Sequence, residues 1–254
     1  MLILTFRLEG PLQAWGALNY FGANRSTAAF PTKSAVTGLL CSCMGWARGD
    51  ARISTLNEKI LMGVRADRRG LPMTDFQTIH TLPRLNLLDT AHPLSPGMLM
   101  TMSGKNRADT GQVSRRTYLQ DASFVVGVSS ADDELLSELY KGLCHPAHTI
   151  YLGRKSCVPS APLNPELHEY VSMEEALTTI PRAARSDCDD LEAEMDAKAV
   201  TDHDAQIGAI RVDALMRDFA TDKDTAFKAR QIVIKALHVA QKGAEYVPNS
   251  TDAV

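Results

Sequence analysis

Apolar and polar residues alternate along the first nine positions of the chain. One face of this run carries Leu2, Leu4, Phe6 and Leu8, and the other carries Thr5, Arg7 and Glu9. A period of two predicts a β-strand with one buried and one exposed face. A loop is expected at residues 10–16.

Residues 33–44 have the spacing of a helix with one apolar face, formed by Val36, Leu39, Leu40 and Cys43. Thr32 is placed to cap the start, and Gly45 to end the helix. Gly38 inside it lowers helix stability, which favours close packing of this position against the strand as compensation.

The pattern continues with a short helix at 53–58, a strand at 60–66, a turn at 68–72 and a returning strand at 73–80. A β-α-β-β order is half of a ferredoxin-like or RRM-type unit. Regularity is lost at 81–116, a stretch interrupted by prolines and glycines. So long an insertion in a compact domain is either functional or a mobile surface loop. Its second half is basic, with Lys105, Arg107, Arg115 and Arg116 against Asp109.

A second β-α-β unit is predicted after the insertion. It consists of a strand at 118–128, a helix that starts at the Ser-x-x-Asp sequence of Ser130 and ends before Pro146, and a short strand at 149–152. The two units predict an α+β, ferredoxin-like domain over residues 1–157, with helices on one face of the sheet. The open face of such a sheet can take RNA bases and phosphates.

Residues 158–254 predict a small, partly β appendage. Ser172 and Glu175 form a capping box for a short helix. Eight acidic residues and one lysine at 187–204 indicate a solvated loop or exposed helix. A strand is expected at 210–216, and residues 231–239 fit either a strand or a helix.

The composition, 44% hydrophobic and 22% charged, is that of a soluble globular protein. No apolar run reaches the length of a membrane span, and the start of the chain has no signal-peptide pattern. Five cysteines without disulfide-framework spacing fit a reducing compartment, so we expect a cytoplasmic protein with no membrane contact.

The net charge of −3 is unevenly distributed. Residues 1–155 hold 17 Lys and Arg against 12 Asp and Glu, and residues 156–254 hold 10 against 18. Because phosphate binding depends on local basic clusters, this asymmetry predicts that nucleic acid binds the N-terminal part of the chain. A solvated basic face remains the alternative.

Two short segments have the chemistry of a phosphate site. Lys33 and Ser34 lie in the first helical turn, where free N–H groups attract anions, although these residues alone favour ordinary capping. Residues 153–156, Gly-Arg-Lys-Ser, combine a permissive backbone with two cations and a hydroxyl. The alternative is a simple basic turn. Trp15 could stack on a base, and Gln13 could hydrogen-bond to a base edge or a phosphate, but a loop tryptophan is more often a core anchor.

No catalytic, metal or cofactor site is predicted. Cys41 and Cys43 would diverge on a helix, and His145 and His148 have no partner cysteines at zinc-finger spacing. The sequence has no Walker, dinucleotide-binding or nucleophile-elbow pattern. A stand-alone small-molecule enzyme is therefore disfavoured.

Four motifs together resemble the CasD family of CRISPR Cascade subunits, members of the RAMP group of RNA-binding proteins. They are G-P-L-Q-A-W-G at 10–16, F-P-T-K-S-A-V-x-G-L-L at 30–40, Y-L-Q-D-A-S-F at 118–124 and Y-L-G-R-K-S-C at 151–157. The resemblance implies a non-catalytic subunit of a type I-E-like Cascade complex. Such a subunit binds the 5′ handle of the guide RNA (crRNA) and caps the backbone. Its partners are the Cascade backbone subunits, the large subunit that reads the PAM and, indirectly, target DNA.

In this family a protruding thumb occupies the position of the 81–116 insertion. The residues expected to bind RNA are Gln13, Trp15, Lys33, Ser34, Arg107, Arg115, Arg116, Tyr118, Gly153, Arg154, Lys155 and Ser156. The alternative function is a metal-independent endoribonuclease that processes repeat RNA, for which His80 beside Tyr118 is the best candidate. The related processing enzymes use a Lys-His pair, and this sequence has no Lys-His dipeptide.

Overall fold

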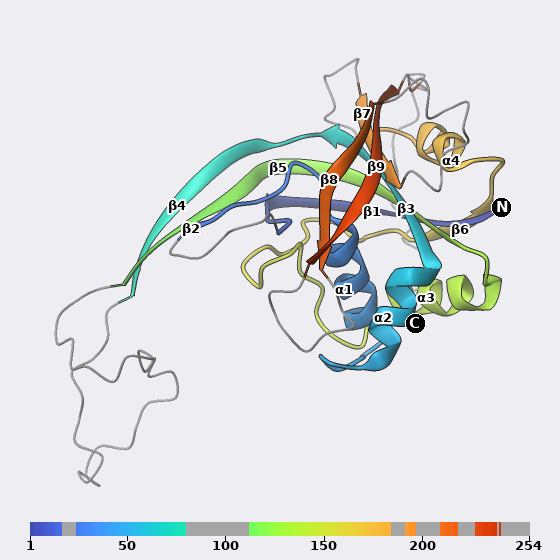
Figure 1. Ribbon diagram of the computed structural model, residues 1–254, viewed down its shortest axis with the longest axis horizontal. Coiled ribbons are helices and arrows are strands. Elements are labelled where there is room, and N and C mark those ends of the chain that lie inside the picture. Colours follow the sequence, from blue (N-terminus) through green and yellow to red (C-terminus); the bar gives the residue numbers. More distant parts are fainter. Residues whose placement is uncertain are drawn as a thin grey trace, which may run out of the picture.

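The computed structural model describes residues 1–16, 24–79, 112–183, 191–196, 209–217, 227–237 and 239, and all structural statements below concern these residues. They form a mixed α/β structure with one curled, largely antiparallel sheet (Figure 1). The elements in chain order are β1 (Leu2–Gln13), β2 (Asn24–Arg25), α1 (Lys33–Cys43), α2 (Ala51–Lys59), β3 (Ile60–Arg68), β4 (Leu71–Ile79), β5 (Gln112–Ser130), α3 (Asp133–Cys144), β6 (Glu166–Glu169), α4 (Met173–Thr179), β7 (Leu191–Asp196), β8 (Ala209–Arg217) and β9 (Phe227–Leu237).

The strand order is β6-β1-β5-β3-β7-β9-β8, and β2 and β4 also pair with β5. β3 and β4 follow one another along the same edge of the long strand β5. The outer halves of β4 and β5 form a hairpin that extends well away from the helices (Figure 1). Parallel pairing places β2 beside β5 on the opposite edge from β4.

Both faces of the central strands are covered. On one face α1, α2 and α3 enclose a core that includes Phe6, Trp15 and Phe124. On the other face α4, β7 and β9 form a second core with Ile3 and Val125. Thr5 and Arg7 are 2% and 8% exposed, so the predictions of a half-exposed first strand and an open face for RNA are wrong here. A sequence period of two identifies the two faces of a strand but not what packs on the second one.

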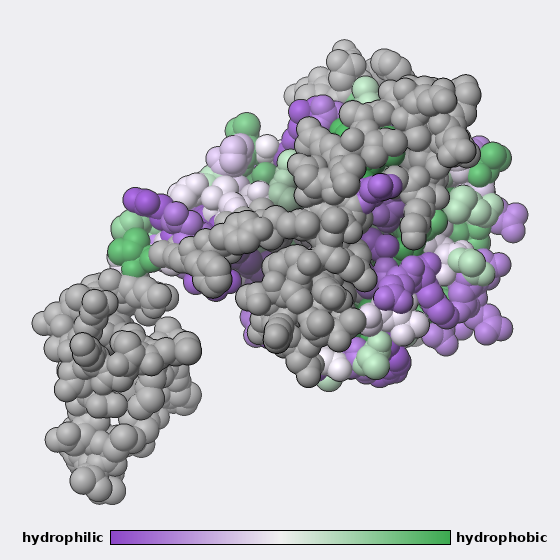
Figure 2. Space-filling model, viewed as in Figure 1, coloured by the Kyte–Doolittle hydropathy of each residue, from purple (hydrophilic) through white to green (hydrophobic). Residues whose placement is uncertain are grey.

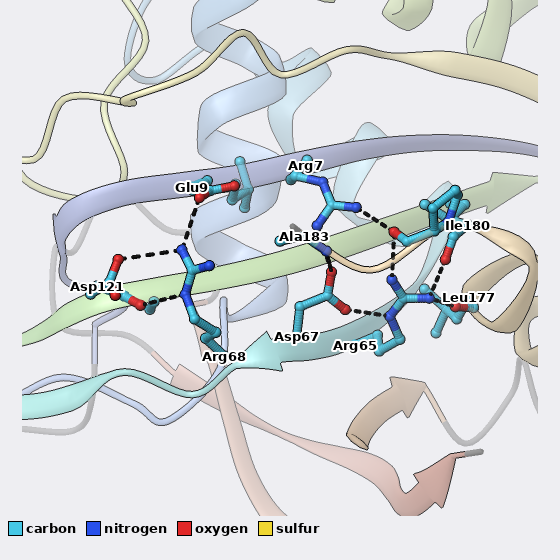
Figure 3. Close-up of polar contacts among 12 residues, drawn as sticks. Arg7, Glu9, Arg65, Asp67, Arg68, Asp121, Leu177, Ile180 and Ala183 are labelled. Carbon is cyan, nitrogen blue, oxygen red and sulfur yellow. Dashed lines mark hydrogen bonds and ion pairs between the residues drawn. The ribbon is translucent and has the colours of Figure 1, made fainter. Parts of the chain in front are cut away.

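Buried charges hold the segment after α4 against this second face (Figure 3). Asp67 accepts hydrogen bonds from Arg7 and Arg65, at 2.5 and 2.6 Å, and from the Ala183 amide at 3.0 Å. The two guanidinium groups also donate to carbonyl oxygens of residues 177, 180 and 181. Burial would raise the pKa of Asp67, but the charges and hydrogen bonds of Arg65 and Arg7 outweigh it and lower that pKa.

α1 confirms the predicted helix, and two of its details differ from expectation. Thr32 occupies the cap position without a side-chain cap hydrogen bond. Gly45 has a φ of +72°, the left-handed conformation that commonly ends a helix. Gly38 is exposed, with no atom within 4 Å of a Cβ added there, so the expectation of close packing is wrong.

Several element boundaries differ from the predicted ones. β1 continues to Gln13 through most of the expected loop, and β5 begins at Gln112, so the last part of the expected insertion belongs to a strand. Residues 149–152 are not a strand; β6 fills that place beside β1. α3 is capped by the side chain of Asp132, which accepts from the Leu135 amide, and not by Ser130.

The C-terminal half contains more strand than predicted. The capping box is confirmed, since the Ser172 hydroxyl accepts from the Glu175 amide at 3.1 Å. Part of the acidic stretch is the strand β7, whose Asp196 is buried. β8 confirms the strand near 210–216, and β9 resolves the last alternative in favour of a strand.

Residues on both sides of the proposed 157/158 boundary share one sheet, because β6 pairs with β1 and β7 with β3. The division into two domains stays a prediction. Among the described helices, none combines the length and apolar character needed to cross a membrane.

Candidate nucleic-acid interface

Three arginines from distant parts of the sequence meet where the β4–β5 hairpin leaves the body of the protein. β2 pairs in parallel with β5, and the register sets Arg25 beside Arg116. Residues in register point to the same side of a sheet, so both side chains lie on one face. Tyr118, two residues further along β5, lies beneath this face: its side chain is 3% exposed and packs in the core, and the Arg154 guanidinium lies 4.6 Å from its ring centroid. We call Arg25, Arg116 and Arg154 the Arg116 face.

Arg154 joins the segments that form this face. Its guanidinium donates to the Thr117 carbonyl oxygen at 3.1 Å and to the Arg25 carbonyl oxygen at 2.9 Å. Stacking on Tyr118 adds a cation–π contact. Arg154 therefore fixes β2 and β5 relative to each other, in addition to carrying charge.

The turn at residues 153–156 is fixed by a close backbone approach. Leu152 accepts from the Ala14 amide at 3.0 Å and donates its own amide to the Cys157 carbonyl at 2.7 Å. Gly153 has a φ of +97°, and an added Cβ would overlap the Ala14 carbonyl oxygen, so only glycine fits. The turn leaves Lys155 and Ser156 exposed.

The surroundings of the Arg116 face are mostly positive. Asp75 is the carboxylate opposite Arg116 across the β4–β5 pair, and it accepts a hydrogen bond from Gln77 at 2.6 Å. Arg25 and Lys155 are exposed and Arg116 is half-buried. These donors suit phosphate oxygens, and each guanidinium can form two parallel hydrogen bonds.

Gln13 and Trp15 are buried, with no exposed surface. The Trp15 indole N–H donates to the Gln13 side-chain oxygen at 3.0 Å, and the Gln13 amide donates to the carbonyls of Leu8 and Ala122 at 3.2 and 2.7 Å. The geometry therefore favours the alternative for Trp15, a core anchor held by a buried polar partner. Neither side chain offers a surface to RNA in this conformation.

Lys33 is 7% exposed, and its ammonium lies 3.7 Å from a carboxylate oxygen of Asp196. The same carboxylate accepts from the Met62 amide at 2.8 Å. The anion near the start of α1 is therefore the Asp196 carboxylate of β7. A phosphate would have to displace this carboxylate to reach Lys33, while Ser34 beside it is half-buried.

The remaining expected residues are separated from the Arg116 face. Arg115 is exposed on the opposite side of β5, and Arg107 and His80 lie outside the described residues. Sequence reasoning missed Arg25. Its only regular structure is a two-residue strand that pairs with β5 some ninety residues later, so no local pattern could have identified it.

Comparisons with known proteins agree with this architecture. A family model described as CRISPR-associated protein (Cas_Cas5) matches residues 3–221. CRISPR system Cascade subunit CasD of Escherichia coli K12 is 34% identical over 168 residues, covering 63% of this chain and 68% of that protein. A structure named "CRISPR RNA-guided surveillance complex" has a TM-score of 0.65 at 22% identity, covering 93% of this chain and 90% of its own. Another, "Crystal structure of Cas protein", has a TM-score of 0.59 at 27% identity, covering 93% and 95%. The chain belongs to the Cas5 family of CRISPR-associated proteins.

Proposed function

We propose that this chain is a non-catalytic, RNA-binding subunit of a Cascade surveillance complex and that it holds the 5′ handle of the guide RNA. Family membership and the similarity to CasD support a role in Cascade. The observation that carries the RNA-binding part is the meeting of Arg25, Arg116 and Arg154 on one side of the hairpin.

Cations of this face and of the neighbouring turn would contact the RNA backbone. Arg25 and Arg116 would bind phosphate oxygens through their guanidinium groups, and Lys155 would add a point charge from the neighbouring turn. Arg154 would act as a positioning residue, because two of its hydrogen bonds already go to backbone carbonyls. Lys33 could join the RNA contacts only by leaving Asp196.

The fold supports the finer assignment to the RAMP group. The path β1-α1-β3-β5-α3-β6, with sheet order β6-β1-β5-β3, has the connectivity of a ferredoxin-like unit. The projecting β4–β5 hairpin would be the stem of the family's thumb, which packs on the neighbouring backbone subunit. Under this proposal the protein works in the cytoplasm, contacts the large subunit and meets target DNA only indirectly.

The proposal is tested by binding of labelled guide RNA to the full chain at several salt concentrations. The variant Arg25→Gln/Arg116→Gln/Lys155→Gln removes three charges, and Lys141→Gln on α3 is the matched control remote from the hairpin (Figure 1). Each phosphate contact to a single strand contributes about 0.7 to the slope of log K against log salt. We expect the triple variant to lose about two from this slope, and the control to keep it. An unchanged slope would remove these residues from the interface.

The rival function, endoribonuclease activity, is tested with repeat RNA in the presence of EDTA. We expect no cleavage. Cleavage that disappears in His80→Ala would replace the non-catalytic assignment.

A further inference from the structure

The β4–β5 hairpin joins the body of the protein at a break in the sheet. β3 and β4 pair in succession with the same edge of β5, and two residues, Arg69 and Gly70, separate them. A register shift between Ala66 and Arg68 marks a bulge at the end of β3. Because bulges bend a strand and increase its twist, the hairpin changes direction at this joint.

Both chain segments of the joint contain a residue in the left-handed conformation. Gly70 has a φ of +74°, and a Cβ added there would lie 2.8 Å from the Gln120 carbonyl oxygen. Asp121 of β5 has a φ of +53°. Aspartate adopts this conformation more readily than most residues, but the conformation persists only where the surroundings hold it. The contacts of Asp121 therefore determine how β5 continues into the hairpin.

The ladder of hydrogen bonds between strands does not supply these contacts. Asp121 is the one residue of β5 with no partner in register on either edge within the described sheet. On the β3 and β4 side it faces the break between the two strands, and on the β1 side the neighbouring residue is Pro11, which has no N–H to donate. Some other group must hold this position of β5.

The Arg68 side chain, which is 14% exposed, is that group (Figure 3). Its Nε donates to the Asp121 carbonyl oxygen at 3.1 Å, and its Nη2 donates to the Asp121 carboxylate at 3.3 Å and to the Glu9 carboxylate at 2.8 Å. Arg68 and Glu9 are both in register with Ser123 of β5, so the guanidinium reaches across β5 from β3 to β1. Arg68 thereby links Asp121 to both strands that flank β5 in the body.

The hairpin has few other attachments. Among the described helices and strands, β4 has extensive contacts with β5 alone. The space-filling view shows apolar and polar side chains intermixed along the projecting hairpin (Figure 2). A two-stranded ribbon has little rigidity of its own, so its direction depends on what holds it at its base.

We infer that Arg68 is a positioning residue: it sets the direction in which the hairpin leaves the body by holding Asp121 in its left-handed conformation against Glu9. This inference concerns the shape of the free protein and goes beyond the proposed function. Its consequence for binding is preorganisation, because a hairpin that already points in its bound direction loses less conformational freedom when a partner binds.

The direction of the hairpin is measured in the full chain by the distance between two spin labels. One label is attached to Cys144, an exposed cysteine at the end of α3, and the other to Thr78→Cys, at an exposed position near the outer end of β4. Cys188, which lies outside the described residues, is replaced by serine. The three remaining cysteines are buried and so react poorly with the label.

Four variants in this background separate positioning from stabilisation. Arg68→Met removes the guanidinium and should turn one narrow distance distribution into a broad or shifted one. Arg69→Met is the matched control, because Arg69 is the adjacent arginine, is 58% exposed and pairs with Glu192 of β7 at 2.6 Å. It should keep the narrow distribution. Asp121→Val disfavours a positive φ and should behave like Arg68→Met, whereas Asp121→Asn tolerates it and should behave like the parent.

Two outcomes would overturn the inference. If Arg68→Met lowers Tm but keeps the distance distribution, Arg68 only stabilises the fold, and the contacts of β2 and Arg154 hold the hairpin. If Arg69→Met broadens the distribution as much as Arg68→Met does, any loss of charge at the joint has the same effect.

Binding of guide RNA to the same variants separates this inference from the proposed function. If the freed hairpin keeps its original direction a tenth of the time, the affinity of a ligand that needs this direction falls about 10-fold. A broad distance distribution together with this loss supports both. A broad distribution with wild-type RNA affinity supports the positioning role of Arg68 and contradicts the proposed role of the hairpin in RNA binding.

Discussion

Replacing Asp67 by Asn should lower the free energy of unfolding by far more than the loss of a single charge suggests. Asp67 is fully buried and lies between two guanidinium groups, Arg7 and Arg65, which are 8% and 0% exposed. The substitution keeps the shape but removes the carboxylate charge that two buried guanidinium groups contact. Removing one partner from a buried ionic group costs about 3–5 kcal/mol. For a chain of this size that lowers Tm by about 6–20 °C.

Thermal and urea unfolding, followed by circular dichroism at pH 7, measure this effect. Asp121→Asn is the matched control, because Asp121 also pairs with an arginine, Arg68, but its side chain is 65% exposed. An exposed ion pair contributes at most about 1 kcal/mol. If the two variants lose the same stability, the buried cluster does not hold the segment after α4.

The cluster also predicts a pH dependence. The Arg65 and Arg7 charges outweigh burial and depress the pKa of Asp67 below its ordinary 3.8. Near that pH the unfolded chain binds a proton that the folded protein does not, so this stabilisation is complete above about pH 5 and is lost as the pH falls through the lowered pKa. Wild type should therefore lose more stability than Asp67→Asn between pH 5 and pH 2. Equal losses of stability in wild type and Asp67→Asn would contradict the lowered pKa of Asp67.

Two further predictions concern residues that the sequence associated with RNA. Lys33→Met and Asp196→Asn should each lower Tm, and a double-mutant cycle should give a coupling energy of about 0.5–3 kcal/mol between the two residues. The affinity of Lys33→Met for guide RNA should equal that of wild type. Loss of RNA affinity without such coupling would return Lys33 to the interface. Gly153→Ala should destabilise the protein by more than 1 kcal/mol in urea unfolding, because its φ of +97° and the adjacent backbone exclude a methyl group; wild-type stability would show that the turn can shift.

Short-range patterns predicted most of the elements. The spacing of Val36, Leu39 and Leu40 placed α1 correctly, and Gly45 marked its end. The capping box at Ser172 located α4. These signals are local, since helix periodicity and caps involve residues within a few positions of each other.

Polar residues were harder to interpret. Thr5, Arg7 and Asp196 looked solvent-facing, yet each is buried. A charged residue can be buried when a partner compensates for its desolvation, and these partners come from residues more than fifty positions away. The sequence also directed attention to Trp15 and Lys33, whose side chains bind other parts of the protein.

The sequence by itself determined the family, the helices and the basic character of the N-terminal part, because these depend on motifs, local periodicity and composition. Only the tertiary structure decided which cations share a surface. Arg25, Arg116 and Arg154 come together through a parallel strand pair and through hydrogen bonds from one guanidinium to two distant carbonyls. The pleat of β5 puts the adjacent Arg115 and Arg116 on opposite faces of the hairpin, and the strand register decides their partners, Phe76 for Arg115 and Asp75 for Arg116.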